Sequence, residues 1–307
     1  MERNDQYRGA GAWLLRALAI DAPDDPHARR VVRWAFGLAA LAIVLRVVFW
    51  VWTQRYWEDA LLTCLHAENA ALGIGLTHWR PGHMPLHGFT SPLSVLIPLI
   101  GDLMHVGFGL EFIKLVSLPA AALTVLYAMG IGLHPRIGLP LPLTVLACGY
   151  IAIEHHQMLF GMAGMETQVA TLVLVMSLYY AVAWKPVLLG ASLGLCMLAR
   201  PDFAFWTVLV GIYGLWRAPR QMPLVVAIAL ALYLPWILWT AWYYGSPIPH
   251  TILAKGMGYD TWMDVPGTDT FAGLRRHVWI TLSEHLLIFL SPAFAGHGAG
   301  VHRFFTA

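Results

Sequence analysis

The chain consists mainly of long apolar stretches separated by short polar connections. In the first stretch, residues 31–52, the only charged residues are Arg33 near its start and Arg46 near its end. About 20 apolar residues are enough for a helix to cross the hydrocarbon core of a bilayer. This stretch is therefore predicted to be the first membrane-spanning helix.

Further apolar stretches follow and are predicted to be spans two to nine. They cover approximately residues 93–108, 112–133, 139–153, 167–184, 187–199, 203–216, 224–243 and 278–294. The stretch at 139–153 is short and has Pro140 and Pro142 at its start, so we expect a re-entrant or tilted piece there rather than a full span. The pattern predicts an all-α polytopic membrane protein with about eight to nine transmembrane helices.

The composition agrees with a membrane location. Apolar residues make up 58% of the chain and charged residues only 12%, whereas a soluble domain carries roughly 25% charged residues. The formal net charge is only +2, and we expect membrane lipids and no nucleic acid as partners. Cys64, Cys148 and Cys196 are odd in number and far apart, which argues against a disulfide framework or a thiolate metal site.

The basic residues predict the orientation of the chain. Residues 1–30 contain several arginines and no apolar stretch near Met1, so a cleavable signal peptide is not expected. Positive residues beside a first span mark the cytoplasmic side. Residues 1–30 are therefore predicted to be cytoplasmic, together with Lys185 and the turn at 217–220. The large first loop, residues 54–91, is predicted to lie outside.

Two adjacent carboxylates, Glu58 and Asp59, directly follow the first apolar stretch. Burying a carboxylate is costly, so these side chains are expected in a polar cleft or in water. A solvated helix end is the simpler interpretation of the pair. Residues 63–72 are predicted to form a short amphipathic helix at the membrane surface, with Glu68 and Asn69 on its polar side.

Several short motifs occur in a characteristic order. They are Glu58-Asp59-Ala60, Glu68-Asn69-Ala70, Gly73-Ile74-Gly75-Leu76, Arg80-Pro81-Gly82-His83, Gly88-Phe89-Thr90-Ser91-Pro92-Leu93, Gly164-Met165-Glu166-Thr167, Ala199-Arg200-Pro201-Asp202, and a segment from Tyr244-Gly245 through Pro249-His250-Thr251 to Lys255. In this order the chain, over about residues 31–258, resembles the polytopic GT-C glycosyltransferases, and in particular the mycobacterial arabinofuranosyltransferase B type. It departs from that pattern at Glu58, Glu68, His83 and His250, where the family has Asp, Arg, Glu and Asn.

The resemblance implies a membrane-embedded inverting glycosyltransferase. Such an enzyme moves a sugar from a polyprenyl-phosphate donor to a cell-envelope glycan or lipid acceptor, at the outer face of the bacterial plasma membrane. Residues 31–296 would form the GT-C-like transmembrane domain, and residues 297–307 a short tail. Relatives usually continue through more spans, so we expect a truncated member of the family.

Inverting transfer requires a carboxylate that takes the proton of the acceptor hydroxyl. Asp59 is the candidate base, because the family keeps Asp at that position, and Glu58 lies beside it. The leaving phosphate requires a cation on the same face, and the candidates are Arg200, Lys255 and His250. For Arg200, pairing with Asp202 or snorkelling to the interface is an alternative role.

Contacts to the sugar or acceptor are predicted for the remaining polar residues of the motifs, which are Glu68, Asn69, His83, Glu166 and Asp202. For Glu166 a favourable interaction with the helix dipole is the alternative. No metal ligands are assigned and no cofactor is expected, although a divalent cation bridged by the two first-loop acids and phosphate stays open.

Two other classes of function would use the same residues differently. In a transporter or lipid flippase the charges would line a substrate path. In an inactive, truncated scaffold they would bind a polyprenyl lipid or a partner helix without turnover.

Overall fold

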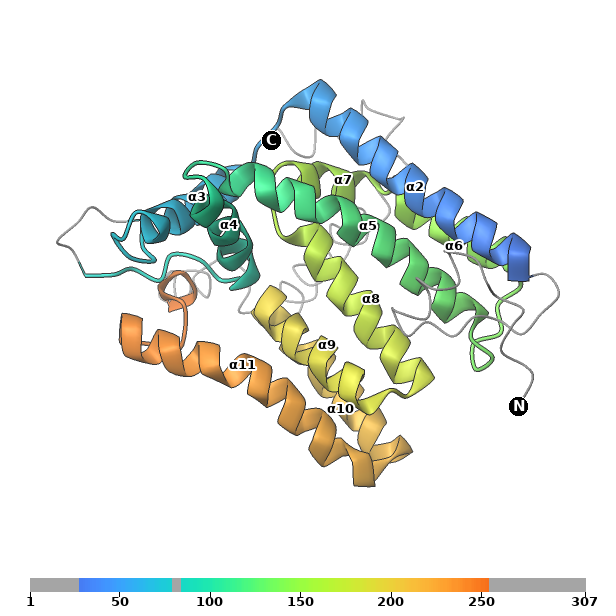
Figure 1. The fold of residues 1–307 in the computed structure, drawn as a ribbon. Helices are drawn as coiled ribbons and strands as arrows, with labels where there is room; N and C mark the ends of the chain where they lie inside the picture. Colours follow the sequence, from blue (N-terminus) through green and yellow to red (C-terminus); the bar gives the residue numbers. More distant parts are fainter. Residues whose placement is uncertain (1–27, 79–83, 254–307) are drawn as a thin grey trace, which may run out of the picture. The chain divides into compact units, whose positions relative to one another are not determined.

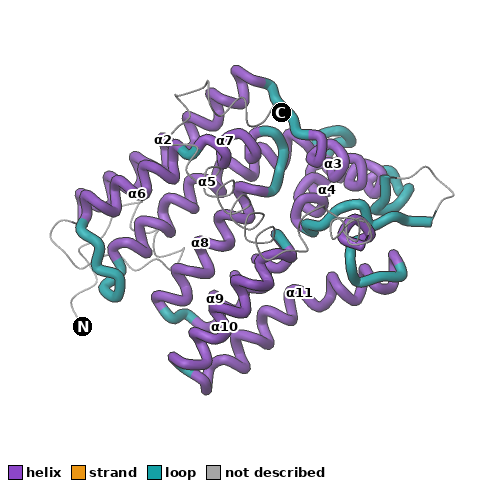
Figure 2. The backbone as a smooth tube through the Cα atoms, turned by 180° about the vertical axis from the view of Figure 1, so that it is seen from behind, coloured by secondary structure: helices purple, strands orange, loops and turns teal. Residues whose placement is uncertain are grey.

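The computed structural model describes residues 28–78 and 84–253, and this part of the chain forms helices and loops without a β-strand (Figures 1 and 2). The α-helices are α2 (Ala28–Thr53), α3 (Glu58–Ala71), α4 (Leu93–Met104), α5 (Gly109–Leu133), α6 (Leu141–Ile153), α7 (His155–Met162), α8 (Thr167–Ala183), α9 (Pro186–Ala199), α10 (Ala204–Arg217) and α11 (Met222–Tyr244). Two 3-10 turns, η1 (Pro201–Phe203) and η2 (Pro219–Gln221), precede α10 and α11. The chain divides into the compact units Met1–His250 and Thr251–Ala307, and the fold below is that of the first unit.

Within the described residues, three helices are long and apolar enough to cross a membrane: Arg30–Thr53, Gly109–Leu133 and Pro219–Tyr244. α4, α8 and α9 are also apolar but shorter. An all-helical protein with membrane-spanning helices is thus confirmed, while the count of eight to nine spans stays a prediction. The stretch at 278–294, the amino-terminal residues 1–27 and the tail at 297–307 lie outside the described residues.

The main core lies where α2, α5, α6, α8 and α9 meet. The face of α2 that points inward consists of small residues, Ala35, Ala39 and Ala42, each at most 5% exposed. Small residues let membrane helices approach closely. The opposite face of α2 exposes Val44 and Val48, as expected for a surface in contact with lipid.

α6 runs back along α5 in the opposite direction. The Leu139 N–H, just before α6, donates to the carbonyl oxygen of Gly132 near the end of α5, at 2.9 Å. Further along, Cys148 Sγ lies 3.9 Å from the Val125 oxygen. The chain then breaks at Glu154, whose carboxylate accepts from the N–H groups at the start of α7. Together α6 and α7 reach about 33 Å at 1.5 Å per residue, which is enough to cross a bilayer.

α4 is the helix that is too short to cross, and this differs from the prediction for residues 139–153. Its 12 residues span about 18 Å, against a hydrocarbon core of about 30 Å. The apolar run is cut because Asp102 accepts the N–H groups of Gly107 and Gly109, at 3.0 and 2.8 Å, and so forms a tight turn into α5. α3 and α4 lie together at the end of the bundle where α5 begins (Figure 1).

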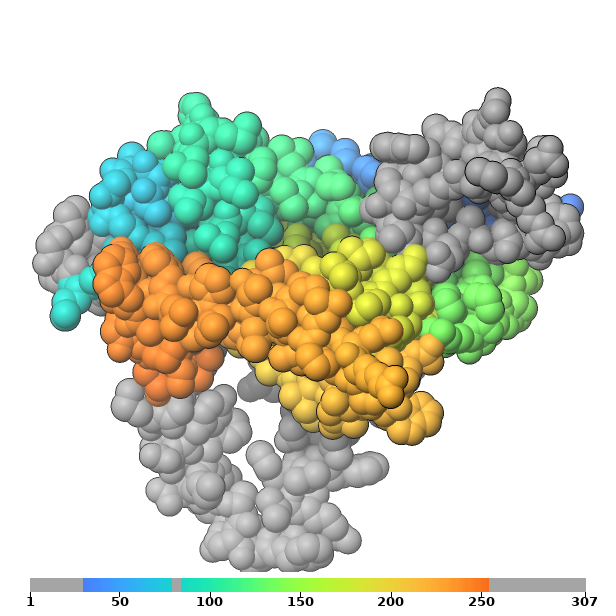
Figure 3. Space-filling view, turned by 60° about the horizontal axis from the view of Figure 1, so that its bottom comes forward, coloured from blue at the N-terminus to red at the C-terminus, as the bar shows by residue number. Residues whose placement is uncertain are grey.

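A second apolar cluster joins the first loop to the end of α11. It contains Ala67 of α3, Leu76, Phe89, Val95 of α4 and Tyr244 of α11. In the space-filling view the end of α11 lies directly beside α3 and α4 (Figure 3). The segment at 84–92, which leads into α4, is therefore held between two parts of the chain that are far apart in sequence.

Candidate functional site

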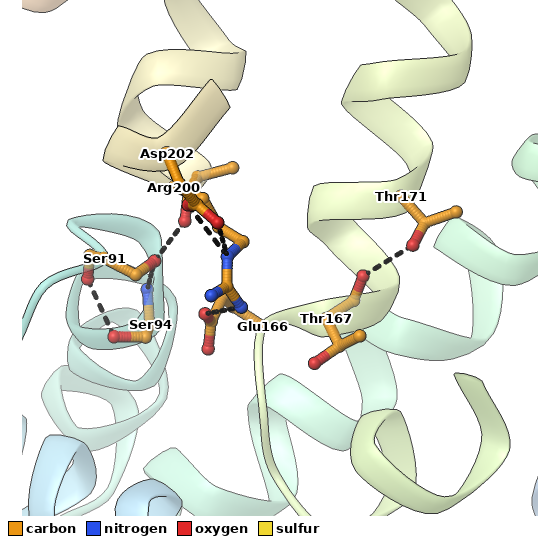
Figure 4. A network of polar contacts seen from close by, with 8 residues as sticks. Ser91, Ser94, Glu166, Thr167, Thr171, Arg200 and Asp202 are labelled. Atoms are coloured by element: carbon orange, nitrogen blue, oxygen red, sulfur yellow. Dashed lines mark hydrogen bonds and ion pairs between the residues drawn. The ribbon is translucent and has the colours of Figure 1, made fainter. Parts of the chain in front are cut away.

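A buried carboxylate and an arginine from different helices meet at one end of the bundle (Figure 4). Glu166 immediately precedes α8 and is 5% exposed. Its Oε1 lies 3.6 Å from Arg200 Nη1, at the end of α9. Arg200 Nε also donates to Asp202 Oδ1 at 3.1 Å. The structure thus brings together three of the residues singled out in the sequence.

The backbone around Arg200 explains where its side chain points. α9 ends at Ala199, and Arg200 is extended, with φ −155° and ψ 124°. A residue before proline disfavours the helical region, and Pro201 follows here. Ser91 Oγ donates to the Ala199 oxygen, so the segment before α4 is bonded to the end of α9 (Figure 4). Arg200 therefore leaves α9 at a point fixed by two elements.

The start of α3 is attached to the segment that leads to Glu166. The Trp57 N–H donates to the Ala163 oxygen at 3.0 Å, and the Trp57 ring meets Phe160 of α7 edge to face at 5.2 Å. Gly164 has φ +90°, and a Cβ there would lie 3.2 Å from Ala60 Cβ. A glycine is thus required both by the turn and by the close approach of α3.

Glu58 and Asp59 are the first residues of α3, and both are exposed. The predicted interfacial helix therefore starts at residue 58 rather than 63, and the acids begin it instead of ending the first span. Carboxylates in the first turn are favoured by the helix dipole. The exposure agrees with the expectation that the pair lies in water or a polar cleft.

Electrostatics connect Asp59 to the buried carboxylate. Burial raises the pKa of Glu166, the negative charges of Asp202 and Asp59 raise it further, and Arg200 opposes the shift. A carboxyl group with a raised pKa holds its proton more readily near neutral pH. Asp59, Glu166, Arg200 and Asp202 thus form one interacting group from the starts of α3 and α8 and the end of α9.

Other predicted site residues are not part of this group. Glu68 and Asn69 lie near the end of α3, about 15 Å along the helix from Asp59, and Asn69 Nδ2 donates to the Thr77 oxygen at 2.7 Å. That bond closes the turn after α3. His83 and Lys255 lie outside the described residues, so their roles stay predictions. In residues 28–78 and 84–253, no group of three or more His, Cys, Asp and Glu could hold a metal ion.

His250 contacts the segment before α4 instead of Arg200. The His87 N–H donates to His250 Nδ1 at 3.3 Å, and the His250 N–H donates back to the His87 oxygen at 3.1 Å. The His87 ring stacks on Tyr244 with a centroid separation of 4.5 Å. This cluster was not predicted from the sequence. The alternating His87, Phe89 and Ser91, all buried, could have indicated it.

A histidine pair supports the same segment from below. His66 Nδ1 lies 2.7 Å from the Leu62 oxygen, and its Nε2 lies 3.2 Å from His78 Nδ1. A Cβ at Gly88 would lie 2.9 Å from nitrogens of both rings. Glycine is therefore needed where the segment crosses the histidine pair.

These histidines predict that stability falls in acid. Burial, and then neighbouring histidines, lower the pKa of His87 to about 4, and burial also lowers the pKa of His66. The unfolded chain therefore binds more protons than the folded chain below pH 6.5, so stability is complete above that pH and is lost as the pH falls towards 4. The loss from His87 is about 3 kcal/mol.

The measurement is the midpoint of thermal unfolding in detergent at pH 7 and pH 4.5. His87→Phe keeps a ring on Tyr244 and should have a smaller acid shift than the wild type. His105→Phe changes an exposed histidine and serves as the control. Equal acid shifts in the wild type and His87→Phe would contradict the role of His87.

The chemistry of the site follows from its side chains. A guanidinium at the end of an apolar bundle can bind a phosphate, and a nearby exposed carboxylate can accept a proton. Comparison of the chain with protein families, curated proteins and solved structures finds no match. The assignment of a function depends on these residues and on their positions.

Proposed function

We propose that this chain is a membrane-embedded inverting glycosyltransferase. It moves a sugar from a polyprenyl-phosphate donor to a cell-envelope glycan or lipid acceptor at the outer face of the bacterial plasma membrane. The observation that carries the proposal is the meeting of the α3 acids, Glu166 and Arg200 at one end of an apolar helical bundle.

In the proposed reaction the acceptor hydroxyl oxygen attacks the anomeric carbon of the donor sugar. The bond from that carbon to the phosphate oxygen breaks, and the configuration inverts. Asp59 takes the acceptor proton as the new bond forms. Arg200 stabilises the negative charge that develops on the leaving polyprenyl phosphate. Glu166, beside Arg200, holds the guanidinium in place and contacts the sugar.

The pairing of Arg200 leaves it available for a ligand. Asp202 is 64% exposed at its side chain, and ion pairs between exposed groups contribute little because water screens them. A phosphate dianion can therefore replace Asp202 at the guanidinium. The distance of 3.6 Å to Glu166 leaves that contact looser than a charge-assisted hydrogen bond of about 2.7–2.9 Å.

An apolar groove supports a lipid-linked substrate. It has a volume of about 360 Å³ and lies between the first loop, α4 and α11, where Leu96, Leu99, Trp236, Trp239 and Tyr243 line it. Such a surface accommodates hydrocarbon.

The charge inside the membrane helices favours a reaction site over a translocation path. Arg46 in α2 is 1% exposed and bonded to helix carbonyls and an amide. A transport path would instead present such a charge to a water-filled cavity.

The test is glycosyl transfer by the purified full chain reconstituted in liposomes. Polyprenyl-phosphate-linked pentose and hexose donors are supplied with cell-envelope glycan and lipid acceptors, and both the glycosylated product and the released polyprenyl phosphate are measured. Equal amounts of the two products support the proposal. Movement of the donor between leaflets without release of polyprenyl phosphate would favour the flippase, and donor binding without either would favour the scaffold.

The orientation is tested separately by cysteine labelling of intact cells, in a Cys64→Ala background. Met84 and Pro247 are exposed on the side of the site, and Arg220 is exposed in the turn between α10 and α11. A membrane-impermeant maleimide should label Met84→Cys and Pro247→Cys but not Arg220→Cys. Labelling of Arg220→Cys alone would reverse the proposed orientation.

A further inference from the structure

Arg46 is the largest fully buried side chain in the described part of the chain, and it lies inside a membrane-spanning helix. A charged residue there is costly unless polar groups surround it. Arg46 Nη1 donates to the carbonyl oxygens of Ala42 and Ala152, at 3.1 and 3.0 Å, and Nε donates to Gln168 Oε1 at 3.0 Å. The guanidinium therefore connects α2 with α6 and α8.

The partner on α6 exists because the chain breaks there. α6 ends at Ile153, and the last carbonyls of a helix have no partner within it. The Ala152 oxygen is one of these, and a cation at a helix carboxyl end is favoured by the helix dipole. Arg46 thus binds the end of α6 at the point where α7 begins.

The partner on α8 has both ends of its amide engaged. Gln168 is 1% exposed, accepts from Arg46 and donates through Nε2 to Thr124 Oγ1 at 3.3 Å. Thr124 in turn donates to the Ala120 oxygen of α5 at 2.7 Å. Since the amide oxygen and nitrogen have different partners, the side chain has one orientation. Gln168 therefore fixes the first turn of α8 against α2 and α5.

Glu166 lies two residues before Gln168. We propose that Arg46 is a positioning residue: through Gln168 it fixes the start of α8 and so holds the Glu166 carboxylate beside Arg200. The proposal rests on the proposed function only for its catalytic consequence. The placement of the α8 start is a property of the fold and is measured on its own.

A role limited to stability makes a different prediction, and a paired substitution separates the two. Removing one member of a buried polar pair leaves the other unpaired and is destabilising, whereas replacing both by apolar residues is often neutral. The single variants Arg46→Met and Gln168→Leu should unfold at lower temperature. The double variant Arg46→Met/Gln168→Leu should regain most of that stability but not the position of Glu166.

The position is read from the reactivity of Thr167→Cys, the residue between Glu166 and Gln168, in a Cys64→Ala background. The rate of reaction with a water-soluble methanethiosulfonate should change several-fold when the double variant is introduced. Turnover of glycosyl transfer should fall by up to about 10²-fold with the KM for donor nearly unchanged, since small misplacements of catalytic groups have effects of that size. Tyr180→Phe is the matched control, because it removes the buried hydroxyl contact of 2.6 Å between Tyr127 and Tyr180 near the other end of α8.

Recovery of stability together with wild-type Thr167→Cys reactivity in the double variant would overturn the proposal. The same holds if Tyr180→Phe changes the reactivity as much as the double variant does. If the wild type transfers no sugar from any donor, the proposed function fails, and the Thr167→Cys rates alone decide whether Arg46 positions the start of α8.

Discussion

Asp59→Asn is expected to lower the turnover of glycosyl transfer by about 10²- to 10⁴-fold, the usual contribution of general-base catalysis. An amide cannot accept the acceptor proton, while its size leaves the start of α3 unchanged. Binding of a polyprenyl phosphate should stay close to wild type, because the phosphate is assigned to Arg200. Turnover at saturating donor and the dissociation constant of the lipid phosphate measure the two effects separately.

Glu58→Gln is the matched control for Asp59→Asn. Both residues lie in the first turn of α3 and both are exposed, but neighbouring side chains on a helix point about 100° apart. Only one of them is expected to face the acceptor, so Glu58→Gln should reduce turnover less. Transfer that is unaffected by Asp59→Asn would remove Asp59 from the reaction.

Arg200→Ala is expected to lower turnover by about 10²- to 10³-fold, as removal of a group that stabilises developing negative charge typically does. It should also weaken binding of a polyprenyl phosphate. The reason is that Arg200 brings a guanidinium to the buried Glu166 and lies near Asp59. Turnover and lipid-phosphate affinity in liposomes are the measurements, and Arg200→Lys should retain part of both because it keeps the charge but not the planar fork.

Arg220→Ala serves as the control for Arg200→Ala. Arg220 is exposed and lies in the turn before α11, away from the start of α8. It should leave both quantities unchanged. If Arg200→Ala and Arg220→Ala bind the lipid phosphate equally well, Arg200 is not part of the phosphate site.

The sequence by itself determined the helical, membrane-embedded character of the chain and the limits of several helices. Continuous apolar runs bounded by prolines, glycines or charges gave α5, α8, α9 and α11 within a few residues of the structure. These limits depend on local length and polarity, which a sequence contains directly. The motifs containing Glu166, Arg200 and Asp202 were also found as local clusters of polar residues between apolar runs.

The sequence did not determine which apolar run fails to cross the bundle. α4 and α6 have similar lengths and hydropathy, and each contains or follows proline. Their difference comes from contacts with distant residues: α4 turns into α5 at Asp102, while α6 packs along α5 and continues into α7. Local pattern cannot distinguish these outcomes.

Only the tertiary structure decided which polar residues act together. Glu68 and Asn69 belong to the same first loop as Asp59, yet they lie at the far end of α3, whereas Arg200 lies in the same site despite a separation of more than a hundred residues. Arg46 was visible only as a charge inside an apolar run. Its partners, Ala152 and Gln168, meet it because α2, α6 and α8 pack together, and a buried charge is stable only where packing supplies its hydrogen bonds.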